Sequence, residues 1–184
     1  MSVASPIIIE GPDGAGKTTL AKRVAEHYGL EYRRPPLDLL SSSEGPRVGL
    51  AEWWDAELAR APSDLATTVY DRCFYISDPI YQQAQPHREL ILSPHSLAQG
   101  IMKLWNVEPY IIFCLTDFNA VLRNVRQAGR SHLDITAEEL CKVWNQYWAY
   151  YAMWQSSLFE QVRKYDYEEE GAWDRLVDHF EAVA

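Results

Sequence analysis

A segment near the start of the chain has the residue types and spacing of a phosphate-binding loop. Residues 7–19 are IIIEGPDGAGKTT, and they contain the pattern G-x-x-x-x-G-K-[ST]. In such a loop, backbone N–H groups and the start of the next helix present positive potential to phosphate oxygens. The lysine reaches the β- and γ-phosphates, and the threonine hydroxyl ligates Mg²⁺. The sequence therefore predicts a nucleoside triphosphate site that comprises Gly11, Asp13, Gly14, Ala15, Gly16, Lys17, Thr18 and Thr19.

The residues around this loop must hold it between a strand and a helix. Residues 6–10 include three consecutive isoleucines, which is typical of a buried parallel strand. From Lys17, apolar residues recur at helical spacing as far as Tyr28, and Gly29 then favours a left-handed stop. The motif thus lies in the strand–loop–helix context that it requires.

The alternation of strands and helices continues along the chain. Further strands are expected at 30–33, 67–70, 109–115 and 162–167, and helices at 48–60, 77–83, 96–105, 117–127, 136–159 and around 173–180. Asp117 is the expected N-cap of one helix, and Thr136 and Glu139 form a capping box at the start of the next. We therefore expect one α/β domain over residues 1–184, with the three-layer P-loop NTPase fold, a parallel sheet of about five strands and helices on both faces.

This fold class also predicts which polar residues come together. Ligands of open parallel sheets bind outside the carboxyl ends of the strands. The phosphate loop, Arg33 and Arg34 after the second strand, and Asp71 and Arg72 after the third should therefore surround one cleft.

Composition narrows the class of protein. The chain has no run of about 18 apolar residues, so no membrane span is expected. It has no basic and apolar leader before the loop, and its cysteines at 73, 114 and 141 form no paired motif, which favours a reduced, cytoplasmic protein. A net charge of −9 counts against binding of long nucleic acid without excluding it.

Among P-loop proteins, the chain best suits a small-molecule kinase. It lacks the N-K-x-D signature of switch GTPases, and at 184 residues it is short for a motor or AAA-type ATPase. Phosphoryl transfer requires two substrates in line and stabilisation of charge on the transferred group, and scattered arginines can supply that charge.

The sequence resembles the thymidylate kinase family. The loop of residues 9–19 is similar to that family's first motif, and Tyr70-Asp71-Arg72 with the later Ser77, Tyr81 and Gln82 is similar to its D-R motif and the residues that follow. Arg33-Arg34-Pro35 lies where the family has R-E-P, with arginine in place of glutamate. The resemblance implies Mg²⁺-dependent transfer of the γ-phosphate of ATP to the 5′-phosphate of a deoxynucleotide.

The resemblance also implies roles for individual residues. Asp13 would lie near the acceptor and the transferred phosphate, Arg72 would hold the acceptor phosphate by a forked pair of hydrogen bonds, and Asp71 would lie near the metal. Arg33 matches the family arginine, and Arg34 is also a candidate for the acceptor.

An arginine-bearing segment at about 123–134 is expected to act as a lid. Arg123 and Arg126 share a helical face, and Arg130 follows the break at Gly129. We expect Arg123 to contact ATP, and Arg126 or Arg130 to stabilise the charge of the transition state.

The acceptor's base is less clearly specified. The family places an aromatic residue and an arginine on the helix before the D-R strand, and this chain offers Trp53 or Trp54 without the arginine. Adjacent helical residues point about 100° apart, so at most one tryptophan should face the cleft. Tyr81 and Gln82 are further candidates for polar contacts with the sugar or base.

Several alternatives remain open. The acceptor is dTMP or a related or modified pyrimidine nucleotide, and the main alternative is a deoxynucleoside, for which Glu31 is a poor match to the required base. A kinase of modified nucleotides in DNA and a non-enzymatic NTP-binding module are further alternatives. The five histidines show no metal-ligand spacing with cysteines, and the aromatic residues from Trp144 to Trp154 suit a core more than a homodimer surface.

Overall fold

All five strands of the computed structural model, which describes residues 5–36, 48–85, 93–128, 135–156 and 161–183, form one parallel sheet. Their order across the sheet is β2-β3-β1-β4-β5, so β1 lies in the centre and β2 at one edge. The strands are β1 (Ile7–Glu10), β2 (Glu31–Arg33), β3 (Thr68–Asp71), β4 (Tyr110–Cys114) and β5 (Val162–Tyr165).

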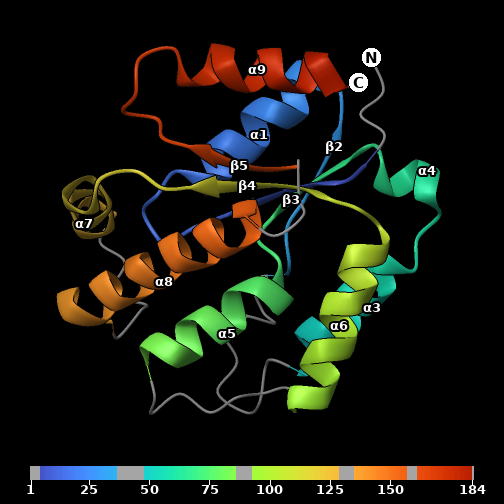
Figure 1. Ribbon diagram of the computed structural model, residues 1–184, viewed down its shortest axis with the longest axis horizontal. Helices are drawn as coiled ribbons and strands as arrows, with labels where there is room; N and C mark the ends of the chain where they lie inside the picture. Colours follow the sequence, from blue (N-terminus) through green and yellow to red (C-terminus); the bar gives the residue numbers. More distant parts are fainter. Residues whose placement is uncertain (1–4, 37–47, 86–92, 129–134, 157–160, 184) are drawn as a thin grey trace.

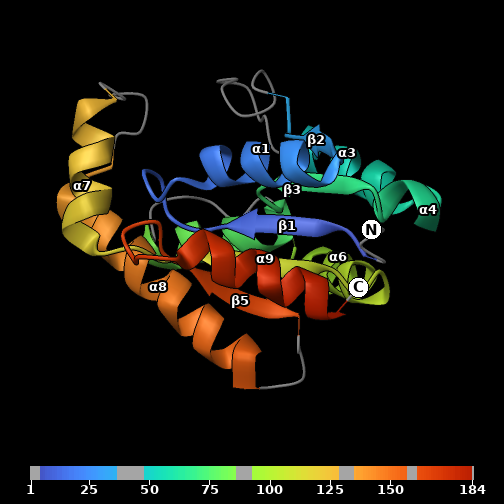
Figure 2. The ribbon, with the colours of Figure 1, turned by 90° about the horizontal axis from the view of Figure 1, so that it is seen from above.

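Helices cover both faces of this sheet. They are α1 (Lys17–Tyr28), α3 (Val48–Leu58), α4 (Pro62–Leu65), α5 (Phe74–Ala84), α6 (Pro94–Asn106), α7 (Phe118–Gln127), α8 (Ala137–Ser156) and α9 (Ala172–Val183). Figure 1 shows α1 and α9 on one side of the sheet and α3, α5, α6 and α8 on the other. In Figure 2, α7 stands at one end of the sheet, beside the loop between β1 and α1. The predicted three-layer α/β fold is therefore confirmed.

Alternating residues of the strands build two separate cores. Ile7 and Ile9 pack with Leu20 and Val24 of α1, whereas Ile8 packs with residues of α3, α5 and α8 such as Trp54. Because side chains alternate across a sheet and both faces are covered, the central strands contain few polar residues. Glu10 is the exception in β1, and its side chain is fully buried.

Local capping signals predicted several helix boundaries correctly. The predicted and observed ranges of α1 agree, and the Asp117 side chain accepts a hydrogen bond from Asn119 N at 2.8 Å as the N-cap of α7. At the start of α8, Glu139 N donates to Thr136 Oγ1 at 3.2 Å and Thr136 N donates to Glu139 Oε2 at 2.7 Å, which confirms the capping box.

Other boundaries differ from the prediction. Helix α5 begins at Phe74, before the expected Ser77, because the chain turns into it directly after Arg72. The short α4 was not predicted, since four residues with proline at the first position give almost no periodic signal. Strand β5 ends at Tyr165, and residues 129–134 of the expected lid lie outside the described residues. Among the described residues, no helix combines the length and apolar character needed to cross a bilayer.

Candidate active site

A cavity of about 250 Å³ lies at the carboxyl ends of β1 and β3, where the fold predicts a ligand site. The phosphate loop forms one wall, Asp71 ends β3 and Arg72 follows it, and α7 closes a further side. The lining residues are Asp13, Gly14, Gly16, Lys17, Thr18, Thr19, Arg34, Asp71, Arg72, Asn124, Val125 and Ala128.

Two glycines allow the phosphate loop to lie against its neighbours. Gly11 has a φ of +144°, and a Cβ atom there would come within 2.5 Å of the Cys114 carbonyl oxygen at the end of β4. Gly14 has a φ of +82°, and its Cβ would come within 2.7 Å of the Val121 carbonyl oxygen in α7. The loop is thus held between β4 and α7, and α1 begins at Lys17 with its N-terminus at the cavity, which is an arrangement that binds anions.

Lys17 lies buried at the base of the cavity. Its Nζ donates a hydrogen bond to the Pro12 carbonyl at 2.6 Å and lies 3.9 Å from Asp13 Oδ1. Burial, and then the positive charge of Arg72, lower the pKa of Lys17 to about 8. The side chain therefore carries its charge at neutral pH but holds its proton less tightly than a surface lysine.

Asp71 is the centre of a second polar group. Its Oδ2 accepts hydrogen bonds from Thr18 Oγ1 at 2.6 Å and Tyr32 OH at 3.0 Å, and lies 3.8 Å from Arg34 Nε. Mg²⁺ prefers oxygen ligands and commonly takes one or two from the protein and the rest from water and substrate phosphates. Thr18 and Asp71 fit that donor set, and the described residues contain no group of three or more His, Cys, Asp or Glu side chains that could hold a metal.

Asp13 and Arg72 form a third group together with Tyr81. Arg72 has a left-handed φ of +82°, and its guanidinium pairs with Asp13 Oδ1. Tyr81 OH donates to Asp13 Oδ2 at 2.7 Å and accepts a hydrogen bond from Arg72 at 3.4 Å. Left-handed geometry is strained for a residue with a side chain and is often found at functional sites. Tyr81, predicted to contact the acceptor, is 4% exposed and holds Asp13 and Arg72 instead of lining the cavity.

Glu10 is a buried ionisable residue for which sequence reasoning assigned no role. Its carboxylate accepts hydrogen bonds from Cys73 N and from Tyr147 OH, the latter at 3.1 Å. Burial raises the pKa of Glu10 to about 7, and the charge of Arg72 is the largest of the opposing effects. The signal that could have revealed it is a single acidic residue in an otherwise apolar strand, directly before the first glycine of the loop.

This raised pKa predicts a pH-dependent stability. In the unfolded chain Glu10 titrates near 4.5 and in the folded protein near 7, so the folded state binds more protons between these values and loses stability as pH rises through them. We expect Glu10 to contribute on the order of 2 kcal/mol more stability at pH 5 than at pH 7.5.

Urea unfolding of wild type and of the Glu10→Gln variant at both pH values tests this, because the variant should lose that difference. His179, whose pKa is lowered by burial, opposes the trend in both proteins and cancels in the comparison. An equal pH dependence in the two proteins would contradict the assignment.

Arg33 is the last residue of β2 and Arg34 follows it directly, and the two side chains have different surroundings. Arg34 lines the cavity, whereas Arg33, the better match to the family motif, pairs with Glu57 and Glu31 and does not line it. The predicted base-stacking residues also lie elsewhere: Trp54 is fully buried, and Trp53 packs edge-on against it with 5.2 Å between ring centroids. Neither tryptophan lines the cavity, and nor does Gln82 in α5.

Helix α7 contributes different residues from those predicted. Arg123 pairs with Glu168 at 3.0 Å and Arg126 is exposed. Neither lines the cavity, and Arg130 lies outside the described residues. Asn124, Val125 and Ala128 line it instead, and Asn124 Nδ2 donates to the Gly14 carbonyl and to Tyr167 OH, each at 2.8 Å. Asn124 and Ala128 are four residues apart and thus share a helix face, which is the pattern that could have revealed them.

Comparison with known proteins supports the three-layer α/β fold described above. No family model matches the chain. A cytidylate kinase of Desulfurococcus amylolyticus is 27% identical over 162 residues, which are 84% of this chain and 80% of the relative. The structure of a deoxyadenosine kinase from M. mycoides with dCMP and dCDP has a TM-score of 0.69 and 16% identity, and covers 97% of this chain and 100% of its own.

Two other solved structures are similar. YorR from Bacillus subtilis, in complex with phosphorylated GDP, has a TM-score of 0.67 and 16% identity over 97% of this chain and 95% of its own. Shikimate kinase from Acinetobacter baumannii has a TM-score of 0.61 and 15% identity over 99% of this chain and 94% of its own. The chain has the fold of P-loop kinases. None of these four proteins is a thymidylate kinase, so the comparisons give no support to that finer assignment.

Proposed function

We propose that this protein is an ATP- and Mg²⁺-dependent kinase that phosphorylates a pyrimidine nucleoside monophosphate. The observation that carries the proposal is the set of charges in one cavity: the cations Lys17, Arg34 and Arg72 face it together with the carboxylates Asp13 and Asp71. A phosphate donor and a phosphorylated acceptor bring two sets of negative charge into the same space. Lys17 serves the donor, and two arginines beyond the loop remain for the acceptor.

The donor half of the site rests on the loop. The backbone N–H groups at the start of α1 bind phosphate oxygens, and the Lys17 ammonium lies at the base of the same cavity. Thr18 and Asp71 are the residues that would hold Mg²⁺, and a bound ion would neutralise negative charge on the phosphates. Tyr32 and Thr18 orient the Asp71 carboxylate by their hydrogen bonds.

The acceptor half rests on Arg72 and Arg34. Arg72 presents a fork of N–H donors suited to a phosphate, and Asp13 and Tyr81 fix its orientation. A phosphate oxygen is already anionic and needs no strong base before it attacks the γ-phosphorus, so positioning and charge stabilisation suffice.

A deoxynucleoside acceptor is the second candidate, and the structure offers one observation in its favour. A hydroxyl acceptor requires a carboxylate base. Asp13 is such a carboxylate: it lines the cavity and lies beside Arg72. Glu31 is excluded from that role in this geometry, because it pairs with Arg33 and Arg60 and does not line the cavity.

Release of ADP measured with a panel of acceptors tests the proposal. The panel comprises dTMP, dCMP, CMP and AMP, the matching nucleosides, and a short DNA oligonucleotide. We expect a pyrimidine monophosphate to give the highest kcat/KM, about 10- to 100-fold above its nucleoside, because charged hydrogen bonds contribute about 1.5–3 kcal/mol. Faster turnover of nucleosides than of monophosphates would favour the second candidate. ADP release stimulated by the oligonucleotide alone would indicate action on DNA. Binding of ATP without turnover of any acceptor would indicate a regulatory module.

A further inference from the structure

Strand β2 presents site residues on one face and a charged cluster on the other. Successive side chains of a strand point to opposite sides. Tyr32, and Arg34 directly after the end of the strand, lie on the side where both reach the Asp71 carboxylate. Glu31 and Arg33 lie on the opposite side and pair with residues of α3 and the turn that follows it.

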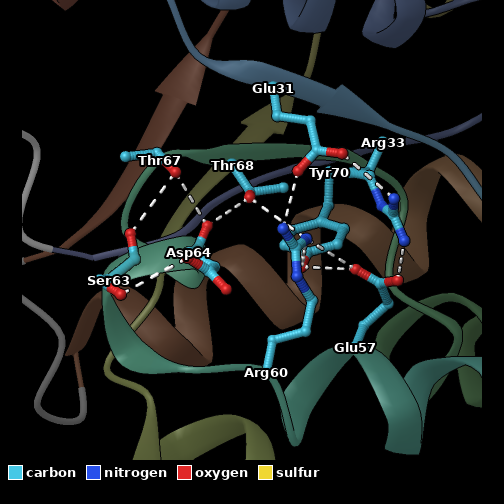
Figure 3. A network of polar contacts seen from close by, with 9 residues as sticks. All are labelled: Glu31, Arg33, Glu57, Arg60, Ser63, Asp64, Thr67, Thr68 and Tyr70. Carbon is cyan, nitrogen blue, oxygen red and sulfur yellow. Dashed lines mark hydrogen bonds and ion pairs between the residues drawn. The ribbon is translucent and has the colours of Figure 1, made fainter.

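This second set of contacts, here termed the Glu57 clasp, consists of Glu31, Arg33, Glu57, Arg60 and Tyr70 (Figure 3). The Glu57 side chain is 5% exposed, and its two oxygens divide the partners. Oε1 accepts from Arg33, while Oε2 accepts from Arg60 at 3.1 Å and from Tyr70 OH at 2.9 Å. Arg60 also donates to Glu31 at 2.7 Å, so the clasp holds both ends of β2 to one carboxylate and one guanidinium.

Besides these contacts, β2 is held by its pairing with β3 and by Tyr32, which packs against the core on the α1 side of the sheet. The strand is three residues long, lies at the sheet edge and, within the part of the chain that the structure describes, pairs with β3 alone. A buried ion pair contributes little net stability compared with apolar packing, since desolvation offsets most of the attraction. What the pairs do supply is a defined direction, because the two terminal nitrogens of Arg33 donate to different carboxylates, Nη2 to Glu57 and Nη1 to Glu31, and so fix the guanidinium from two sides.

We infer that Glu57 is a positioning residue: by holding Arg33 on one face of β2, it directs the next side chain, Arg34, into the cavity beside Asp71. Glu57 does not itself line the cavity, so it acts through the strand. The acceptor phosphate as the ligand of Arg34 rests on the proposed function. The position of Arg34 beside Asp71 does not depend on it.

A double-mutant cycle tests the inference. Glu57→Gln keeps the shape of the side chain and removes its charge, and Arg34→Gln removes the group that is to be positioned. With the best monophosphate of the panel, we expect each single variant to raise the acceptor KM about tenfold and the double variant to raise it no further. The KM for ATP should stay within about twofold of wild type. If Glu57→Gln fails to fold, Arg33→Gln replaces it in the cycle, because Arg33 is 34% exposed and its loss leaves Glu57 paired with Arg60.

A merely structural role for Glu57 predicts a different result. The effects of Glu57→Gln and Arg34→Gln on the acceptor KM would then multiply, or Glu57→Gln would lower stability without any change in KM. Either result would overturn the inference. Glu169→Gln is the matched control, because Glu169 also joins two cations, Lys164 and Arg175, but lies beyond β5 at the opposite edge of the sheet. It should leave the acceptor KM unchanged.

A spectroscopic readout separates this inference from the proposed function. The ¹⁵N resonance of the Arg34 Nε–H group reports its surroundings beside Asp71 without any substrate. It should shift in Glu57→Gln and stay in place in Glu169→Gln, even if no member of the panel is phosphorylated. An unchanged resonance in Glu57→Gln would refute the positioning role, whereas absence of turnover in wild type would refute only the proposed function.

Discussion

Replacement of Lys17 by methionine is expected to lower turnover about 10³-fold, because the ammonium at the base of the cavity would no longer offset charge on the transferred phosphate. The same replacement should leave the protein at least as stable as wild type. Burial lowers the pKa of Lys17 from 10.5 to about 8, which means that the folded protein sustains a charge in a poorly solvated position. Removing that charge relieves a cost on the order of 3 kcal/mol, while methionine keeps most of the buried side-chain volume.

Two measurements check this prediction together. Coupled ADP release gives the loss of turnover, and urea unfolding gives the stability. Because the Lys17 side chain holds its proton more tightly in the unfolded chain than in the folded chain between pH 8 and 10.5, the stability of wild type relative to that of the variant should rise with pH in that window. Lys142→Met, at an exposed lysine of α8 paired with Glu138, serves as the control and should retain full turnover. Turnover of Lys17→Met within about tenfold of wild type would contradict a phosphate-binding role for the loop.

The fold could be predicted from the sequence because its signals are local. Periodicity and caps are encoded within a few residues: Asp117 caps α7 through Asn119, and Thr136 and Glu139 cap α8 through each other. The alternation of apolar strands and helices then leaves few topologies other than a covered parallel sheet. The phosphate loop was predictable for the same reason, since one short segment carries the glycines, the lysine and the threonine.

The acceptor side of the cavity could not be predicted in the same way, because distant pairings decide it. Arg33 and Arg34 are adjacent arginines, and what distinguishes them is the position of Glu57, 24 residues beyond Arg33. The hydrogen-bonded residues Asp13 and Tyr81 are 68 residues apart in the sequence, and Glu10 and Tyr147 are 137 residues apart. Resemblance to a family orders such residues along the chain, but it does not indicate which of two neighbours faces the cavity. The left-handed turn at Arg72 had no sequence signal either, since left-handed residues are usually glycine or asparagine.

Loss of the Arg72 side chain should chiefly damage use of the acceptor. We expect Arg72→Ala to lower kcat/KM for the acceptor monophosphate about 10²- to 10³-fold, since truncating one partner of a buried charge pair costs about 2–5 kcal/mol. The KM for ATP should change little. Arg72→Lys should recover only part of the loss, because lysine supplies the charge without the fork of donors. If Arg72→Ala phosphorylated the monophosphate as well as wild type does, the acceptor role of Arg72 would be wrong.

Comparison of Arg72→Gly with Arg72→Ala isolates the strain of the backbone at this position. Both variants lack the guanidinium, so both should lose use of the acceptor to the same extent, and both keep the hydrogen bond from Tyr81 OH to Asp13. They differ in that glycine accepts the φ of +82° without a Cβ penalty. The free energy of unfolding of Arg72→Gly should therefore be about 1 kcal/mol higher than that of Arg72→Ala. A more stable glycine variant would assign the strain to the turn itself, which directs the arginine into the cavity. Equal stabilities would indicate that the turn relaxes once the side chain is gone. In that case the pairing of Arg72 with Asp13 would be what holds the backbone in its strained form.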